Sequence, residues 1–324
     1  MKKTKTKLLA VLLTAAMGAL TACGGSGSSE TTAAASGDTQ TAAETTAAVE
    51  LAEGESVSQD TDITAAMLVD FTTMDPMDTS DTLSGGIQRL MMDGLFGFDD
   101  NMKIIPMLAT DYEANDDATE FTIHLREGIQ FSDGTPWNAE AAKANFDRWG
   151  DKNLGLKRTT LLCNVLKETE VVDDYTVKVT LENPFGAFIP TLAHPACVVM
   201  SPAVIAKGNE ECAKNPVGTG QYTFVEWVAG EHATIALNKD WWGYNADICG
   251  GTALVDPDAG FKTITFKPVS ENATRVAMLQ SGDAQFIWPV PSERIETLRG
   301  DSNVAVGQEE GIVVRYLMMN NQKA

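Results

Sequence analysis

The residue types that usually catalyse reactions are present in this 324-residue chain, but not at the spacings that catalysis requires. There is no G-x-S-x-G nucleophile motif, no H-E-x-x-H zinc motif and no Walker A phosphate-binding loop. A dinucleotide-binding loop is also absent, because Gly218 and Gly220 are followed by Thr223 where the third glycine belongs. Asp and Glu are numerous, but nothing singles out a catalytic pair. The sequence therefore favours binding over catalysis, and we expect neither enzyme activity nor a cofactor.

Cysteine and histidine do not form the pattern of a metal site. The four cysteines beyond residue 23 include no C-x-x-C pair and none beside a histidine at zinc spacing, and the three histidines are far apart. A disulfide is chemically permitted outside the cell, but we favour small buried apolar thiols. These residues are Cys163, Cys197, Cys212 and Cys249, and His124, His194 and His232.

Three side chains near the end of the chain are suited to holding a small solute. Arg315 lies in an apolar stretch beside Tyr316, and its guanidinium group could clamp a carboxylate through two hydrogen bonds. A structural ion pair is the alternative. Trp288, followed by Pro-Val-Pro, could form an aromatic wall of a binding cleft, with packing in the core as the alternative.

The start of the chain has the pattern of a secretory signal. Four lysines precede an apolar run from Leu8 to about Leu20, which is too short for a transmembrane helix. Leu20-Thr21-Ala22-Cys23 closes the run and resembles a bacterial lipobox, where the signal is cut before the cysteine. We therefore predict a lipoprotein signal peptide over residues 1–22 and lipidation at Cys23, which would tether the protein to the outer face of the membrane. An ordinary cleaved signal with a chance cysteine is the alternative.

The next segment, residues 23–59, consists mainly of Gly, Ser, Thr, Ala and Glu, and no aromatic residue precedes Phe71. Such a segment buries too little apolar surface to offset chain entropy, so we predict a disordered linker.

The formal net charge of the chain is -21, from 24 basic and 45 acidic residues. This charge argues against nucleic acid as a partner and against electrostatic adhesion to anionic lipid.

Periodicity in the remaining chain predicts strands and helices in irregular alternation. Apolar residues alternate with polar ones over 121–125 and 175–181, which predicts two half-buried strands. A tight turn is expected at 132–134. Asn138 can cap a helix over 139–149 that stops at Gly150, and Ser270 can cap another that ends at Ser281. Strands are also expected at 284–288 and 311–319. The pattern predicts an α/β protein with a mixed sheet.

Several segments, in order, resemble the extracellular solute-binding proteins of peptide-type ABC importers, the class that includes dipeptide, oligopeptide, nickel and glutathione receptors. The longest is FTIHLREGIQFSDGTPWNAE, residues 121–140. Gln221 and Trp241 depart from the usual proline and tyrosine of that class. The other matching segments are Met74-Asp75-Pro76, Asp93 to Phe96, Pro106 with Leu108 and Ala109, Val217 to Tyr222, and Asn238 to Gly243.

A subgroup can be distinguished within this class. Five segments look most like the glutathione-binding receptors: 78–84, 192–196, 275–280, 289–291 and Arg315-Tyr316. The resemblance implies a lipid-anchored receptor that captures a peptide or glutathione-like solute and delivers it to ABC permease and ATPase subunits.

The resemblance also implies the fold, an α/β, peptide-binding class of periplasmic-binding-protein-like architecture. Residues 60–84 and 216–314 would form the mixed-sheet domain of the N-terminal lobe, and 85–215 an inserted sub-domain. Residues 315–324 would begin a hinge crossing. Chains of this class normally continue into a second lobe, so we expect this chain to be C-terminally truncated, with that lobe missing.

The site implied by the resemblance is the loop after the Leu-Asp-Pro-like segment, which faces the cleft. Its hydroxyls could pair with a peptide backbone, and Asp81 could receive an ammonium group. A self-satisfied turn is the alternative. The candidate residues are Thr79, Ser80, Asp81 and Thr82.

Other functions remain open at this point. Within the same class, the solute could be a nickel chelate, heme or an oligosaccharide. Outside it, a surface lipoprotein could act as a chaperone, an adhesin or a sensor partner, and an enzyme is the remaining alternative.

Overall fold

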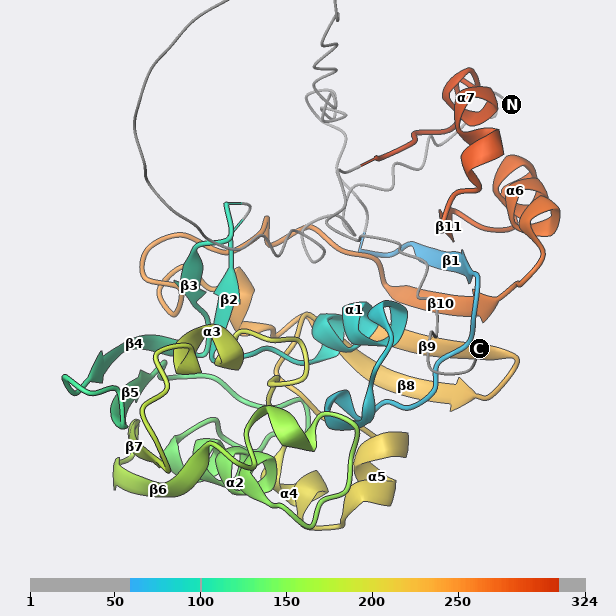
Figure 1. Ribbon diagram of the computed structural model, residues 1–324. Coiled ribbons are helices and arrows are strands. Elements are labelled where there is room, and N and C mark those ends of the chain that lie inside the picture. The colour runs from blue at the N-terminus through green and yellow to red at the C-terminus, as the bar shows by residue number, and fades with distance from the viewer. Residues whose placement is uncertain (1–58, 100, 309–324) are drawn as a thin grey trace, which may run out of the picture.

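The computed structural model describes residues 59–99 and 101–308. Two sheets of different construction organise this part of the chain (Figure 1). The predicted lipidation at Cys23, almost all of the predicted linker, the predicted strand at 311–319, and both Arg315 and Tyr316 lie outside the described residues.

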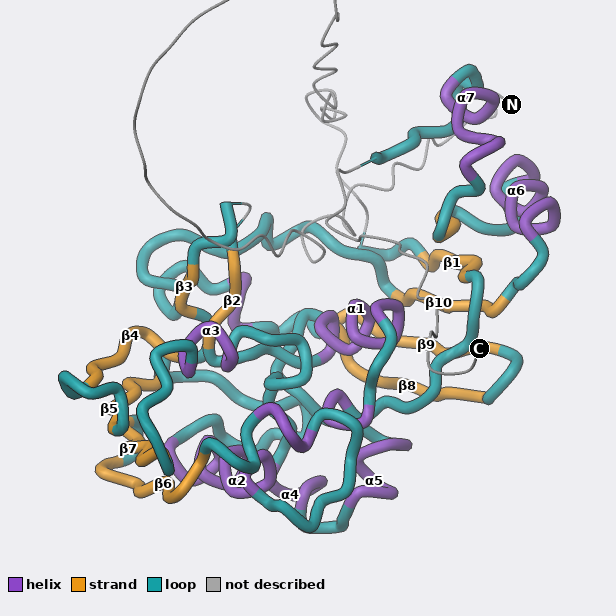
Figure 2. Tube along the Cα trace, viewed as in Figure 1, coloured by secondary structure: helices purple, strands orange, loops and turns teal. Residues whose placement is uncertain are grey.

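The first sheet is mixed, as the sequence predicts. Strand β1 pairs in parallel with both β10 and β11, whereas β9 pairs antiparallel with β10 and β8. The order is β11-β1-β10-β9-β8. Its strands are β1 (Asp62–Met67), β8 (Tyr222–Val228), β9 (His232–Leu237), β10 (Thr263–Pro268) and β11 (Phe286–Trp288). The connection from β9 to β10 is mostly loop (Figure 2).

The second sheet is antiparallel throughout, in the order β4-β5-β7-β6. Both predicted half-buried strands belong to it, and in β5 the apolar side chains of Phe121, Ile123 and Leu125 are buried while the residues between them are not. Its strands are β4 (Ala109–Ala114), β5 (Glu120–Leu125), β6 (Leu166–Asp173) and β7 (Thr176–Leu181). A separate hairpin consists of β2 (Phe96–Phe98) and β3 (Ile104–Pro106).

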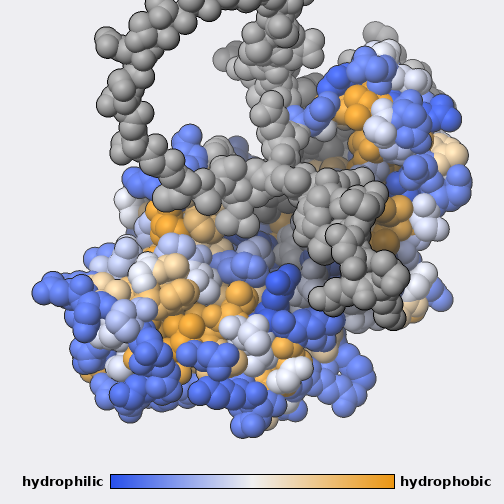
Figure 3. All heavy atoms as spheres, in the orientation of Figure 1, coloured by the Kyte–Doolittle hydropathy of each residue, from blue (hydrophilic) through white to orange (hydrophobic). Residues whose placement is uncertain are grey.

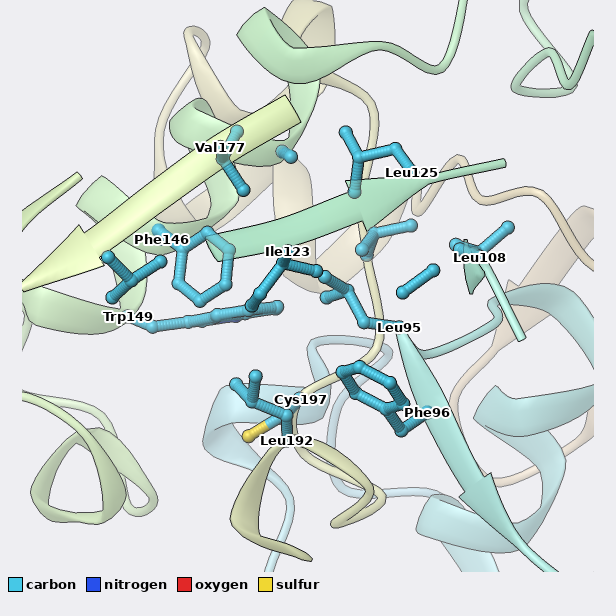
Figure 4. Packing of buried hydrophobic residues seen from close by; sticks show 14 of the residues in the cluster. Leu95, Phe96, Leu108, Ile123, Leu125, Phe146, Trp149, Val177, Leu192 and Cys197 are labelled. Atoms are coloured by element: carbon cyan, nitrogen blue, oxygen red, sulfur yellow. The ribbon is translucent and has the colours of Figure 1, made fainter. Parts of the chain in front are cut away.

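Helix α2 (Ala139–Gly150) covers the second sheet with its apolar face. Phe146 and Trp149 pack with Ile123 and Val177 in one buried cluster (Figure 4). The predicted cap is confirmed, because the Asn138 side chain accepts a hydrogen bond from Ala141 N at 3.0 Å. The predicted stop is wrong by one residue. Gly150 is the last helical residue, and the C-cap is Asp151.

Helix α6 (Asn272–Ser281) ends as predicted, at a left-handed Gly282 with φ 84°. Its cap is not Ser270 as expected, because the Glu271 carboxylate accepts the hydrogen bond from Thr274 N at 3.1 Å. The strand expected at 284–288 begins later, at Phe286. The other helices are η1 (Pro76–Asp78), α1 (Thr82–Met91), η2 (Thr159–Leu161), α3 (Phe188–Leu192), α4 (Pro202–Ile205), α5 (Asn209–Lys214), η3 (Trp242–Tyr244), η4 (Ser292–Arg294) and α7 (Ile295–Arg299).

Each sheet has its own buried core, and half-buried Val217 packs against both. On the face seen in Figure 3, hydrophilic residues form the rim of the part that contains the second sheet, and hydrophobic residues gather at its centre. Among the described residues, no helix has the length and apolarity needed to cross a membrane. The division into a sheet domain and an inserted sub-domain stays a proposal, and its boundary at 84/85 falls inside α1.

Candidate functional site

The loop that carries the predicted solute-binding residues is fixed to α2 by a buried ion pair. Asp75 caps η1 by accepting a hydrogen bond from Met77 N at 3.0 Å, and its carboxylate pairs with the Arg148 guanidinium group of α2. Both side chains are buried. Loss of either charge would leave the other buried and unpaired, so this pair holds the loop firmly in place.

Thr79 is committed to internal hydrogen bonds. Its hydroxyl group donates to the Asp75 carbonyl oxygen at 3.0 Å and accepts from Gln88 Nε2 at 2.7 Å, and the residue is buried. The Arg158 side chain donates from Nε to the Thr79 carbonyl oxygen at 2.9 Å. For this residue the structure supports the alternative interpretation, a turn whose polar groups satisfy one another.

The next three residues lie where the loop becomes helix α1. The Asp81 carboxylate caps the helix by accepting from Ser84 N at 2.8 Å, and it also accepts from the Thr72 hydroxyl group at 3.3 Å. Ser80 and Thr82 are exposed, and their hydroxyl groups make no hydrogen bond to any other described residue. Of the four predicted residues, these two are therefore the ones most open to a solute.

Trp288 lies at the end of β11, where it pairs with Met67 of β1. It is half-buried and packs against the core of the first sheet. The structure therefore supports core packing, the alternative considered for this residue.

Sequence reasoning missed a basic group beside the loop, formed by Arg89 of α1, Arg158 and His194. A Cβ atom added to Gly85, one turn before Arg89, would lie 3.9 Å from Thr79 Cγ2 and 4.0 Å from Pro195 Cβ. The loop and the turn after α3 therefore both pack close to α1. The one sequence signal for this group was the glutathione-receptor-like segment 192–196, which contains His194.

The electrostatics of this group follow from burial and mutual repulsion. Burial, with the positive charges of Arg158 and Arg89, lowers the pKa of His194. Burial also lowers the pKa of Arg89, and the Asp93 carboxylate opposes that shift. Because the imidazole accepts a hydrogen bond at Nδ1 from Ala196 N at 3.0 Å, its neutral form carries the proton on Nε2. At pH 7 it is therefore a neutral donor.

A second polar centre lies just beyond the end of α1 and is acidic. Three donors converge on Asp93 Oδ2: Thr219 Oγ1 at 3.0 Å, Trp241 Nε1 at 3.3 Å and Trp242 Nε1 at 2.8 Å. Burial raises the pKa of Asp93, and these donors oppose the shift. Three of the segments that carry the family resemblance, 93–96, 217–222 and 238–243, therefore meet at one buried carboxylate.

The glycines of the 217–222 segment serve backbone packing, as expected from the sequence. A Cβ atom on Gly218 would lie 2.3 Å from the Met91 carbonyl oxygen and 2.3 Å from Met92 Cγ. On Gly220 it would lie 2.5 Å from the Met91 carbonyl carbon. Only glycine allows the segment to approach the end of α1 this closely.

Other polar features give no second site. An open hollow of about 520 Å³ next to the tryptophans is lined by Gln130, Lys239 and Asn245 among others. No group of three or more His, Cys, Asp or Glu side chains within 59–99 and 101–308 could hold a metal ion. The four cysteines of this part are free thiols, three of them buried, and burial raises the pKa of Cys197 to about 12.

A mixed sheet with an inserted antiparallel sheet, and a polar loop fixed beside α1, describe a binding protein of the extracellular solute-binding class. The chain belongs to the bacterial extracellular solute-binding proteins of family 5, whose "family 5 Middle" model matches residues 103–324.

Curated relatives and solved structures agree with this family. The chain is 41% identical over 259 residues to the glutathione-binding protein GsiB of Shigella dysenteriae and to that of Escherichia coli K12, which covers 80% of this chain and 48% of each relative. It therefore spans about half the length of the curated relatives it matches. The structure of AgaA from A. tumefaciens R10 in complex with agropinic acid is 28% identical, with a TM-score of 0.64, over 74% of this chain and 46% of that one. DppA from Helicobacter pylori, 24% identical with the same TM-score, shares the fold.

Proposed function

We propose that this protein is the receptor of a peptide-type ABC importer, which captures glutathione or a short peptide outside the cell and delivers it to permease and ATPase subunits. The observation that carries the proposal is the 41% identity over 259 residues to proteins named for glutathione binding. The exposed Ser80 and Thr82 hydroxyl groups at the start of α1 support a polar solute at this surface.

The solute can be identified by calorimetric titration. We expect glutathione or a di- or tripeptide to give a measurable heat of binding, and a nickel–histidine chelate, heme and maltotriose to give none. Tight binding of one of those three, with no response to glutathione or peptides, would replace the proposed solute. In cells, deletion of the gene should abolish uptake of the labelled solute, and an unchanged uptake rate would contradict a role in transport.

We further propose that Cys23 becomes the lipidated N-terminus and that residues 23–59 are a linker between the membrane and the folded part. The Leu-Thr-Ala-Cys sequence at the end of the signal carries this proposal. Labelled palmitate should enter the wild-type protein and not Cys23→Ser. Equal labelling of both would exclude the anchor.

The proposed site combines residues of the loop before α1 with two residues near position 315. Ser80, Asp81 and Thr82 would contact the solute from the loop, and Arg315 would hold a carboxylate with Tyr316 beside it. Arg315→Ala should weaken binding by about 2–3 kcal/mol if the guanidinium group makes two hydrogen bonds to the solute. Unchanged affinity would return Arg315 to a structural role.

A further inference from the structure

We propose that Arg89, Arg158 and His194 form a subsite that receives a carboxylate group of the bound solute. This inference rests on the proposed function, because it concerns the surface at which the solute is placed. It narrows the solute class to molecules that present a carboxylate to the first half of α1.

The first argument is that the Arg89 guanidinium group has no hydrogen-bonded anion among the described residues. Arg148 pairs with Asp75 and Arg299 with Glu296, but the side chain of Arg89 makes no hydrogen bond to any described residue. This side chain is half-buried, and the negative charge that acts on it is that of Asp93, whose Oδ2 already accepts from three donors. A partly desolvated guanidinium group without a hydrogen-bonded anion is costly, and an incoming carboxylate would remove that cost.

The second argument is that Arg158 is held in position while most of its donors remain unused. Its Nε donates to the Thr79 carbonyl oxygen at 2.9 Å, and its two terminal nitrogens donate to no described atom. The neighbouring Lys157 differs, because its Nζ donates to the Asp78 carbonyl oxygen at 2.9 Å and pairs with the Asp78 carboxylate. A guanidinium group fixed at Nε is a preorganised donor for a carboxylate.

The third argument is the free space beside the Arg89 side chain. An arginine side chain on a helix leans toward the N-terminus of that helix, so the Arg89 side chain extends over the turn that contains Gly85 and Gly86. A Cβ atom added to Gly86 would meet nothing within 4 Å. The glycine pair therefore leaves room beside the guanidinium group, near the exposed hydroxyl group of Thr82.

The fourth argument is that the charges of the group are not cancelled locally. Asp81 is engaged as the cap of α1, and Asp78 is paired with Lys157. His194 contributes a neutral Nε2 donor, because its Nδ1 accepts from Ala196 N. Two cations and a neutral donor match the acceptor capacity of one carboxylate, which has two oxygens and about four lone-pair directions.

The test is calorimetric titration of the protein with glutathione and with two glutathione amides, each blocked at one carboxyl group. Arg89→Met and Arg158→Met should each bind glutathione about ten- to a hundredfold more weakly, as expected for the loss of a charge-assisted hydrogen bond. Arg299→Met, which removes an exposed arginine of α7, is the matched control and should stay within about twofold. One of the two amides should bind to the wild type more weakly than glutathione does, by a similar factor. For that amide, the affinity of Arg89→Met should equal the affinity of the wild type.

Several outcomes separate this inference from the proposed function. If both folded variants bind glutathione as the wild type does, the subsite is overturned and the receptor function stands. If the wild type does not bind glutathione or peptides, the NMR signals of the His194 ring can be followed during titration with succinate. A shift that is lost in Arg89→Met would support the subsite alone, and no shift would overturn it. Should Arg89→Met fail to fold, Arg89→Gln replaces it in the same measurements, with melting temperature as the check on folding.

Discussion

Two polar centres beside helix α1 are opposite in charge. Arg89, in the last turn of the helix, forms a half-buried basic group with Arg158 and His194, and the two guanidinium groups have no carboxylate partner at hydrogen-bonding distance among the described residues. Just beyond the end of the helix, buried Asp93 accepts from three donors through one oxygen. Three of the segments that carry the family resemblance, 93–96, 217–222 and 238–243, converge on the acidic centre. The difference indicates that those motifs maintain the fold, whereas the residues with unused donors are the ones available to a solute.

The largest expected effect comes from removing the acidic centre. Asp93→Ala would leave the Thr219 hydroxyl group and two indole N–H groups buried without an acceptor. We expect the free energy of unfolding to fall by about 3–5 kcal/mol, measured by urea denaturation. A loss below about 1 kcal/mol would mean that water replaces the carboxylate and that the two polar centres do not differ as described.

A steric test of the same end compares two glycines. Gly218→Ala places a methyl group against the Met91 backbone and should cost about 3 kcal/mol. Gly86→Ala, in the middle of the helix where no atom lies within 4 Å of an added Cβ, should instead stabilise the protein by up to about 1 kcal/mol. The measurement is the midpoint of urea unfolding for both variants. Destabilisation of similar size in both would show that the helix surface at Gly86 is packed rather than open.

The pH dependence of stability should also report on Asp93. Because burial raises its pKa in the folded state, protonation of Asp93 favours folding. That contribution is fully present below the unfolded-state pKa of about 3.8 and is lost as the pH rises through the raised folded-state value. Asp93→Asn does not titrate, so the stability of the wild type relative to this variant should decline as the pH rises above about 4. A relative stability that increases with pH would contradict the raised pKa.

The smallest effect is expected at the basic group. Arg89→Met removes one of the two positive charges that lower the pKa of His194, so that pKa should rise. An NMR titration of the imidazole ring measures it directly, with Arg299→Met as a control that leaves the value unchanged. If the His194 pKa is the same in Arg89→Met, the two side chains are too far apart to act on one ligand.

The sequence predicted the local elements well because their patterns are short. Alternation over 121–125 and 175–181 identified β5 and β7, and Asn138 marked the start of α2. Parallel pairing of β1 with β10 and β11 could not be located, because it joins segments about 200 residues apart. The basic group was missed for a related reason: Arg89 precedes Asp93 by four residues, which is the spacing of an ordinary surface ion pair on a helix.

The position of β1 between β10 and β11 has a consequence for how the protein is made. Residues 62–67 obtain their strand partners only when residues 263–268 and 286–288 are available, and the N–H group of Thr64 is bonded to the Gln285 side chain at 2.8 Å. At a synthesis rate of about 5–20 residues per second, the ribosome needs on the order of ten seconds or more to make the intervening chain. Throughout that time the apolar strand has both edges open. The nascent protein is therefore kept from early closure of this sheet by its own topology.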